Sequence, residues 1–217
     1  MFIIIKFFQK NNHNKFYHNI ISSCKNGSTG ISAHYGANYI DIMYNTFSVR
    51  RYGMYFYTSK HVNIIGNILT DFSWGVFMDD CSFFNISDNI FSEWHVDGIY
   101  SNDCENMIIM GNTFKRTSWG LHFLGTKNCR VIHNSFIRNG EAIYIGGNNN
   151  SFLENNFIQC RFRSIIITNA KNEWDRNYWN WPRIFPKPIF RIVIVVFGTS
   201  RIILDFDFHP AKEPYDI

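Results

Sequence analysis

Carboxylate side chains recur at matching intervals along this sequence, a pattern that suits enzymes that cleave polysaccharides. Asp80 and Asp103 are 23 residues apart, and Asp71 and Glu93 are 22 apart. Asp97 stands in the string Val-Asp-Gly-Ile. Glycoside hydrolysis uses two carboxyl groups that lie about 5–10 Å apart. The catalytic candidates, which could instead be solvated turn residues, are Asp71, Asp79, Asp80, Glu93, Asp97 and Asp103.

Aromatic residues recur at the same interval and suggest a surface that binds sugars. Tyr52, Trp74 and Trp119 each stand directly before a glycine, and Tyr55 and Tyr100 stand two residues after one. Large exposed apolar surfaces usually mark binding sites. The alternative is that the rings stabilise a sheet by packing on one another or beneath a cap. The candidate ligand-binding residues are Tyr52, Tyr55, Trp74, Trp94, Tyr100 and Trp119.

The histidines and cysteines do not suggest a metal site. None of the eight histidines forms an HxH or HxxxH pair, and none of the five cysteines forms a CxxC pair. We therefore expect no metal and no cofactor. Cys81 and Cys104 occupy matching places 23 residues apart, where Ser59 and Thr126 also stand. This indicates a position for small residues, with a Cys81–Cys104 disulfide as the alternative.

These matching intervals reflect an internal repeat of about 22 residues. A small residue followed by alternating apolar positions opens each unit, and an Asn-x-aromatic or Asn-x-aliphatic motif runs in step with it. The unit openings are Gly30, Gly53, Gly75, Gly98, Gly120, Ala142 and Ser164. The asparagines are Asn45, Asn67, Asn89, Asn112, Asn134, Asn155 and Asn177. Two motifs with one period over seven units indicate a solenoid.

The alternation within each unit predicts short strands rather than helices. We expect a single-domain, all-β, right-handed parallel β-helix of about seven coils, with equivalent residues stacked in columns about 4.8 Å apart. Three columns should form the core. The first is Phe47, Leu69, Phe91, Phe114, Phe136, Phe157 and Trp179. The second is Ile42, Ile64, Ile86, Ile109, Val131, Phe152 and Trp174, and the third is Met54, Val76, Ile99, Leu121, Ile143 and Ile165.

The repeated asparagines are expected at sharp corners between strands. Asparagine tolerates the left-handed backbone conformation, and its amide bonds the local backbone. When stacked at the coil spacing, asparagine side chains also bond one another along the axis.

The ends of the solenoid need caps because the end coils expose strand edges and core. We assign residues 1–29 to an N-terminal cap or irregular coil and residues 30–179 to the repeats. Residues 180–217 contain all five prolines and two apolar stretches around Gly198, which predicts a capping hairpin and tail.

Composition and charge argue against a disordered, a nucleic-acid-binding or a membrane-spanning protein. Aromatic residues make up 18% of the chain and charged residues 18%, which argues against disorder. The net charge is +4, and the basic residues form no run, so no nucleic-acid partner is expected. The apolar runs at 2–5 and 192–197 are too short to cross a bilayer. The N-terminus has no signal-peptide core, which fits a cytoplasmic protein or a chain that begins downstream of its export signal.

The period, the Gly-Ile coil openings and the Asn-x-Ile/Phe corners resemble the parallel β-helix repeats of the pectin-lyase-like superfamily. NosD-type modules of archaeal and bacterial surface or periplasmic proteins are the most similar, over about residues 16–179. The segments NEWDRNYWNWP (172–182) and FDFHPAKEPYDI (206–217) resemble endings found in that group. The resemblance implies an extracellular or cell-surface location, and related families cleave glycans.

Three functions follow from these residues. The leading one is a non-catalytic surface or extracellular module that recognises or displays glycan, with a polysaccharide or surface glycan as its partner. The second is a polysaccharide-active enzyme that uses two of the six carboxylate candidates. The third is a structural spacer or a periplasmic NosD-like accessory factor, which is favoured if the aromatic residues lie beneath the cap.

Overall fold

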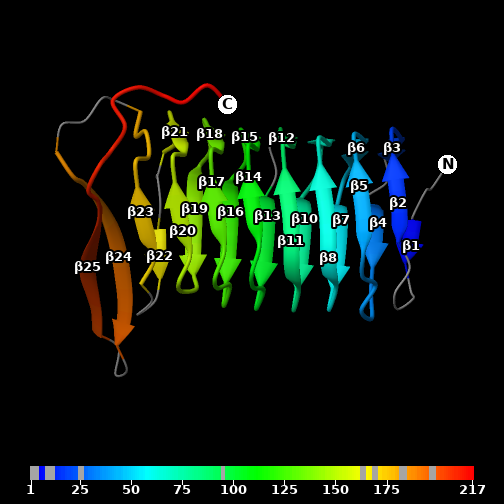
Figure 1. Cartoon of the computed structure of the whole chain (residues 1–217), viewed down its shortest axis with the longest axis horizontal. Coiled ribbons are helices and arrows are strands. Elements are labelled where there is room, and N and C mark those ends of the chain that lie inside the picture. Colours follow the sequence, from blue (N-terminus) through cyan, green and yellow to red (C-terminus); the bar gives the residue numbers. More distant parts are fainter. Residues whose placement is uncertain are drawn as a thin grey trace.

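The computed structural model describes residues 5–7, 13–23, 27–93, 96–161, 165–167, 171–180, 185–195 and 199–217. Within these ranges the chain forms strands and turns and no helix. Three sheets of mostly parallel strands run along the molecule, and each coil up to β21 supplies one strand to each sheet (Figure 1). The prediction of an all-β parallel solenoid with about seven coils is confirmed.

Sheet A has ten strands and carries the candidate aromatic residues. In spatial order they are β1 (Ile5–Phe7), β4 (Thr29–Ala33), β7 (Tyr52–Tyr57), β10 (Trp74–Asp79), β13 (Asp97–Asn102), β16 (Trp119–Leu124), β19 (Glu141–Gly146), β22 (Ile165–Ile167), β24 (Lys187–Val195) and β25 (Thr199–Asp207).

Sheets B and C complete the coils. Sheet B contains β2 (Asn14–Tyr17), β5 (Ile40–Met43), β8 (Lys60–Ile65), β11 (Ser82–Ser87), β14 (Ile108–Met110), β17 (Arg130–Ile132), β20 (Ser151–Leu153) and β23 (Glu173–Asp175). Sheet C contains β3 (Ile20–Ser23), β6 (Thr46–Val49), β9 (Ile68–Thr70), β12 (Ile90–Ser92), β15 (Thr113–Lys115), β18 (Ser135–Ile137) and β21 (Asn156–Ile158).

The three predicted columns form a large part of the core, which also contains a further column with Phe56, Met78, Phe123 and Ile145. Phe91 stacks on Phe114 with ring centroids 4.9 Å apart, and Phe114 stacks on Phe136 at 5.0 Å. Every described side chain of the three columns is buried. Parallel pairing places equivalent residues of successive coils side by side, so a sequence period of 22 becomes a continuous apolar stack.

One position departs from the predicted columns. The repeat aligns Ile165 with Ile143, but the observed register pairs Ile165 with Tyr144. The coil between these residues is one residue shorter than its neighbours, as is the interval from Asn134 to Asn155. Strand β22 is therefore shifted by one residue relative to the prediction.

The asparagine column forms a buried ladder. The Asn67 Oδ1 atom accepts hydrogen bonds from the backbone N and the Nδ2 of Asn45, at 2.9 and 3.0 Å. Its own Nδ2 donates to the Ile42 and Ile65 carbonyls. The same pattern repeats from Asn19 to Asn177. Each asparagine thus satisfies buried backbone groups at a corner and ties neighbouring coils together.

A C-terminal hairpin lies at the end of the solenoid. Strands β24 and β25 pair antiparallel and extend sheet A beyond β22. Asp207, at the end of β25, is buried and takes the next place in the asparagine ladder. Its Oδ2 accepts from Asn177 N at 2.9 Å, from Asn177 Nδ2 at 3.0 Å and from Trp179 Nε1 at 2.9 Å.

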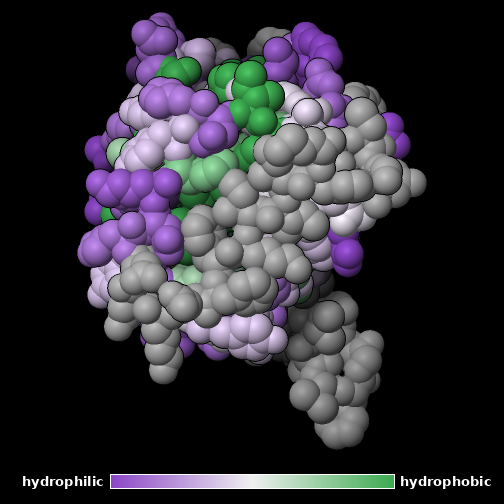
Figure 2. Space-filling view, turned by 90° about the vertical axis from the view of Figure 1, so that its right-hand side faces the viewer, coloured by the Kyte–Doolittle hydropathy of each residue, from purple (hydrophilic) through white to green (hydrophobic). Residues whose placement is uncertain are grey.

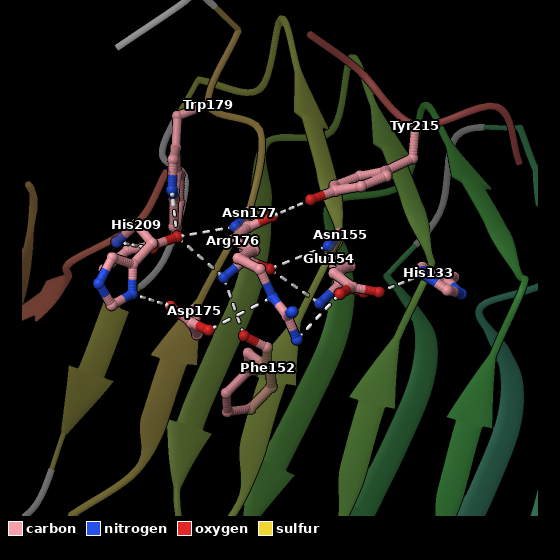
Figure 3. A network of polar contacts seen from close by, with 11 residues as sticks. His133, Phe152, Glu154, Asn155, Asp175, Arg176, Asn177, Trp179, His209 and Tyr215 are labelled. Carbon is pink, nitrogen blue, oxygen red and sulfur yellow. Dashed lines mark hydrogen bonds and ion pairs between the residues drawn. The ribbon is translucent and has the colours of Figure 1, made fainter. Parts of the chain in front are cut away.

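The chain after β25 returns along the corners of sheets B and C (Figure 1). Tyr215 donates from its backbone N to Asn156 Oδ1 at 2.8 Å and from its hydroxyl to the Arg176 carbonyl at 2.7 Å. Beside it, a line of polar contacts runs across the coils from His209 through Asp175, Arg176 and Glu154 to His133 (Figure 3). The tail is therefore fixed to the side of the solenoid away from the outer face of sheet A.

The opposite end holds the N-terminal coil. Strands β2 and β3 pair with β5 and β6, so they take part in the coil pattern. Figure 2 looks at this end and shows hydrophobic side chains bordered by hydrophilic ones. The division of the chain at residues 29/30 and 179/180 stays a prediction.

Candidate functional site

The outer face of sheet A carries two adjacent columns of mostly aromatic side chains. The first column is Tyr52, Trp74, Asp97, Trp119 and Glu141, as the strand register pairs them. The second is Tyr55, Phe77, Tyr100, His122 and Tyr144. All of these except Asp97 are partly exposed. Period-2 alternation accounts for the second column, because its neighbours along each strand, such as Met54 and Phe56, point into the core. The first column stands three residues earlier, where two consecutive buried residues, such as Gly53 and Met54, interrupt the alternation.

Rings of the second column stack on one another along the axis. Tyr55 stacks on Phe77 with centroids 5.2 Å apart, and Phe77 stacks on Tyr100 at 4.6 Å. These rings cover one another's faces and therefore turn their edges and hydroxyls outward. Burial raises the pKa of the Tyr55 and Tyr100 hydroxyls, so both remain neutral hydrogen-bond donors.

The first column is interrupted at Asp97. Tyr52 covers one face of Trp74, with centroids 5.0 Å apart. On the other side of Trp74 the column continues with the short side chain of Asp97 and then with Trp119. Two coil spacings of about 4.8 Å place the two tryptophan backbones about 10 Å apart. Trp74 and Trp119 therefore have no ring between them in this column.

Asp97 and His122 form a polar pair beneath these rings. The Asp97 side chain is only 1% exposed, and its Oδ2 lies 3.4 Å from Nδ1 of His122, which is 15% exposed. Neither Asp97 Oδ1 nor His122 Nδ1 has a hydrogen-bond partner among the residues that the structure describes. Burial raises the pKa of the Asp97 carboxyl, and the nearby His122 and Trp74 side chains act in the opposite direction.

The other carboxylate candidates lie at corners. Asp71, Asp80, Glu93 and Asp103 have left-handed backbones and each directly follows a strand. Asp71 accepts a hydrogen bond from the Ser48 hydroxyl at 2.9 Å. Such positions match solvated turn residues.

Asp79 differs from these four because it belongs to β10. Its Oδ1 accepts from Asn102 Nδ2 on the next coil at 2.8 Å. Asp71 and Glu93 lie at the corner that enters sheet A, and Asp80 and Asp103 lie at the corner that leaves it. Of the candidate ligand-binding residues, Trp94 lies outside the described ranges, and the other five share the outer face of sheet A.

The cysteine column contains free thiols. Cys81 and Cys104 are both free and buried, and each Sγ donates to the carbonyl two residues earlier. Ser59 and Thr126 donate in the same way from the same column. The prediction of a position for small residues is confirmed, and the thiols act there as serine and threonine hydroxyls do.

One functional feature escaped the sequence reasoning. Arg116 and Arg138 follow successive strands of sheet C and line one cavity together with Arg161. In the sequence these arginines look scattered, but two of them are 22 residues apart. The repeat period could have revealed them, since it brings residues at that interval together.

A model of the NosD family, described as periplasmic copper-binding protein, matches residues 4–184. No curated protein matches the sequence. Copper sites in proteins gather several histidine, cysteine or methionine ligands around one ion. In the described part of the chain no three histidine, cysteine, aspartate or glutamate side chains converge in this way. The described residues also contain no helix with the length and apolarity needed to cross a membrane.

The family match covers most of the chain and coincides with the coils seen in the structure. The chain therefore belongs to the NosD family.

Proposed function

We propose that this protein is a non-catalytic carbohydrate-recognition module that acts outside the cytoplasm and binds glycan on the outer face of sheet A. The observation that carries the proposal is the pair of tryptophans, Trp74 and Trp119, that flank Asp97 with no ring between them in their column of described residues. A pyranose ring packs on the face of an aromatic ring, and only an uncovered face can accept it.

The surroundings of the two tryptophans support sugar binding. The hydroxyls of Tyr52, Tyr55 and Tyr100 lie on the same face and can both donate and accept hydrogen bonds. Partly exposed apolar rings with hydrogen-bonding groups alongside them match the two sides of a sugar, one with C–H groups and one with hydroxyls. His122 adds a further polar group beside Trp119, with ring centroids 4.9 Å apart.

The cap leaves this face accessible in the described structure. The tail after β25 bonds Asn156 and Arg176 and lies beside His133, all of which belong to sheets B and C or their corners. This placement argues against the spacer alternative, in which the cap would cover the aromatic residues. The periplasmic description of the family supports a location where glycans are found.

A panel of neutral and acidic polysaccharides tests the proposal by affinity electrophoresis, with polymer length measured after incubation. We expect retention by at least one polymer with unchanged length. Trp74→Ala and Trp119→Ala should each weaken retention by about tenfold or more, as expected for aromatic anchors. Phe83→Ala removes an exposed ring at another corner and should leave retention unchanged.

Two outcomes contradict the proposal. Retention that survives both tryptophan substitutions places the binding surface elsewhere. Shortened polymer shows an enzyme and directs attention to Asp97, whose raised pKa suits a general acid.

A further inference from the structure

The charge of the residues at the corner between sheets C and A changes sign along the solenoid. From β9 to β21, the residue that follows each strand of sheet C has a left-handed backbone, and in successive coils it is Asp71, Glu93, Arg116, Arg138 and Gln159. The column is therefore acidic in the middle coils and basic in the later ones. Because successive coils are about 4.8 Å apart, the two guanidinium-bearing residues are direct neighbours.

These arginines line a cavity of about 340 Å³. Its wall also includes Arg161, Thr117, Ser118 and Gln159, and no acidic side chain lines it. The base is rigid because Thr117 and Asn139 are buried and bonded to each other. Asn139 Oδ1 accepts from Thr117 N at 3.1 Å and from Thr117 Oγ1 at 3.2 Å, and Asn139 Nδ2 donates to the Phe114 carbonyl at 3.1 Å.

Glu93, which stands one coil before Arg116 in the corner column, is the acidic neighbour of the two arginines in that column. No described carboxylate lies within ion-pair distance of Arg116 or Arg138. Arg138 Nε donates to Gln159 Oε1 at 2.8 Å, a bond that orients the guanidinium without cancelling its charge. Two guanidinium groups beside serine and threonine hydroxyls offer the planar donors that carboxylate and sulfate groups accept.

The cavity borders the aromatic face. Ser118 and Gly140 line it, and they directly precede Trp119 and Glu141, the first residues of β16 and β19. Trp119 Nε1 donates to Glu141 Oε2 at 2.8 Å, which fixes the indole at this edge of sheet A. A polymer lying on the aromatic face can therefore place a substituent at the arginines.

We propose that the cavity around Arg116 and Arg138 binds the anionic groups of an acidic polysaccharide, so that the glycan recognised by this protein carries carboxylate or sulfate groups. This inference rests on the proposed function, which assigns the sugar rings to the neighbouring tryptophans. The arginines would select polymers that carry anionic groups, and the aromatic face would bind the sugar rings.

The test compares three polymers: polygalacturonate with carboxylates, dextran sulfate with sulfates, and neutral dextran. The double variant Arg116→Gln/Arg138→Gln should bind its preferred acidic polymer about tenfold or more weakly than the parent protein and should bind neutral dextran unchanged. The matched control, Lys60→Gln/Arg130→Gln, removes the same charge from exposed positions of sheet B. This control should bind all three polymers as the parent does. Comparison of polygalacturonate with dextran sulfate tells whether the cavity prefers carboxylate or sulfate groups.

The results separate this inference from the proposed function. Equal losses in the double variant and in the control show a diffuse charge effect and overturn the cavity assignment, as does unchanged binding in the double variant. Loss of acidic binding through the arginines, with Trp74→Ala and Trp119→Ala unaffected, supports the anion site and contradicts the aromatic sugar site. Single-stranded DNA retained as strongly as the acidic polymers, through the same arginines, overturns the polysaccharide assignment.

Discussion

Oδ2 of Asp97 lies 3.4 Å from Nδ1 of His122 on the neighbouring coil, beneath the half-exposed rings of sheet A. A carboxylate that is almost fully buried is costly unless it is well paired. In this pair the two groups are close without forming a hydrogen bond. The buried carboxyl group of Asp97 therefore lowers the stability of the folded state when it is ionised.

The cost should appear as a pH dependence. Burial raises the folded-state pKa of Asp97 above its usual value of 3.8, so the folded state holds this proton more tightly than the unfolded chain. The protonated Asp97 side chain makes its full contribution to stability when the pH is below the pKa that it has in the unfolded chain. This contribution is lost as the pH rises through the pKa that it has in the folded protein. Asp97→Asn removes this titration and should unfold with a free energy about 1 kcal/mol higher than the parent at pH 7.

Urea unfolding at several pH values checks this prediction. The advantage of Asp97→Asn over the parent should shrink as the pH falls towards 4. Asp71→Asn, at an exposed corner, serves as the control and should stay within about 0.5 kcal/mol of the parent. A difference between Asp97→Asn and the parent that is the same at every pH contradicts the assignment.

The end of the asparagine ladder provides a second prediction. Asp207 Oδ2 accepts three hydrogen bonds from Asn177 and Trp179, and all of these groups are buried. Asp207→Ala leaves the donors without an acceptor and should lower the free energy of unfolding by about 3 kcal/mol. Asp207→Asn introduces the same amide that the other ladder positions carry, so one side-chain oxygen can still accept hydrogen bonds. This variant should lower the free energy of unfolding by about 1 kcal/mol or less. Thermal unfolding of the two variants checks this prediction. An equal loss of stability in both variants would contradict the role of Asp207 in the ladder.

The small residues that open each coil are required by the core. A Cβ added at Gly98 would lie 2.6 Å from Phe114 Cδ1 and 2.7 Å from the Gly120 carbonyl oxygen. Because a backbone atom is one of the two obstacles, the site has little room to relax, and Gly98→Ala should cost about 2 kcal/mol. Lys60→Ala at an exposed position provides the control. An unchanged melting temperature for Gly98→Ala contradicts this packing.

The thiols should differ in reactivity. Cys81, Cys104 and Cys129 are buried, and burial raises the pKa of Cys129 to about 12. Cys160 is only partly buried. In a Cys24→Ser background, iodoacetamide at pH 8 should modify Cys160 first, because alkylation needs an accessible thiolate. Peptide mass mapping checks the order, and early labelling of Cys129 contradicts the burial.

The sequence repeats predicted the fold well because parallel coils convert a period directly into contacts. The columns of Phe114 and Ile109 and the asparagine ladder at Asn112 follow from spacing alone, and the structure confirms them. The left-handed residue of this corner is Gly111, directly before Asn112, and not the asparagine as expected. The exception at Ile165 arises where one coil is a residue shorter, since a strict period cannot follow a local deletion.

Contacts outside the period could not be predicted in the same way. Asp207 reaches Asn177 from a hairpin that follows the repeats, so its place in the ladder depends on the path of the cap. The Asp97–His122 contact joins two different columns on neighbouring strands, and comparison within one column misses it. The Arg116–Arg138 cavity was hidden because basic residues were sought as a run along the chain rather than at the coil interval.

The most direct test of glycan recognition follows the indole N–H signals of the six tryptophans by NMR during titration with oligomers of polygalacturonate and of dextran. Tryptophan-to-phenylalanine variants assign the signals. The account predicts that Trp74 and Trp119 shift with at least one oligomer, while the buried Trp174 and Trp179 do not. Signals of Trp74 and Trp119 that stay fixed with both oligomers, or shifts confined to Trp174 and Trp179, would contradict it.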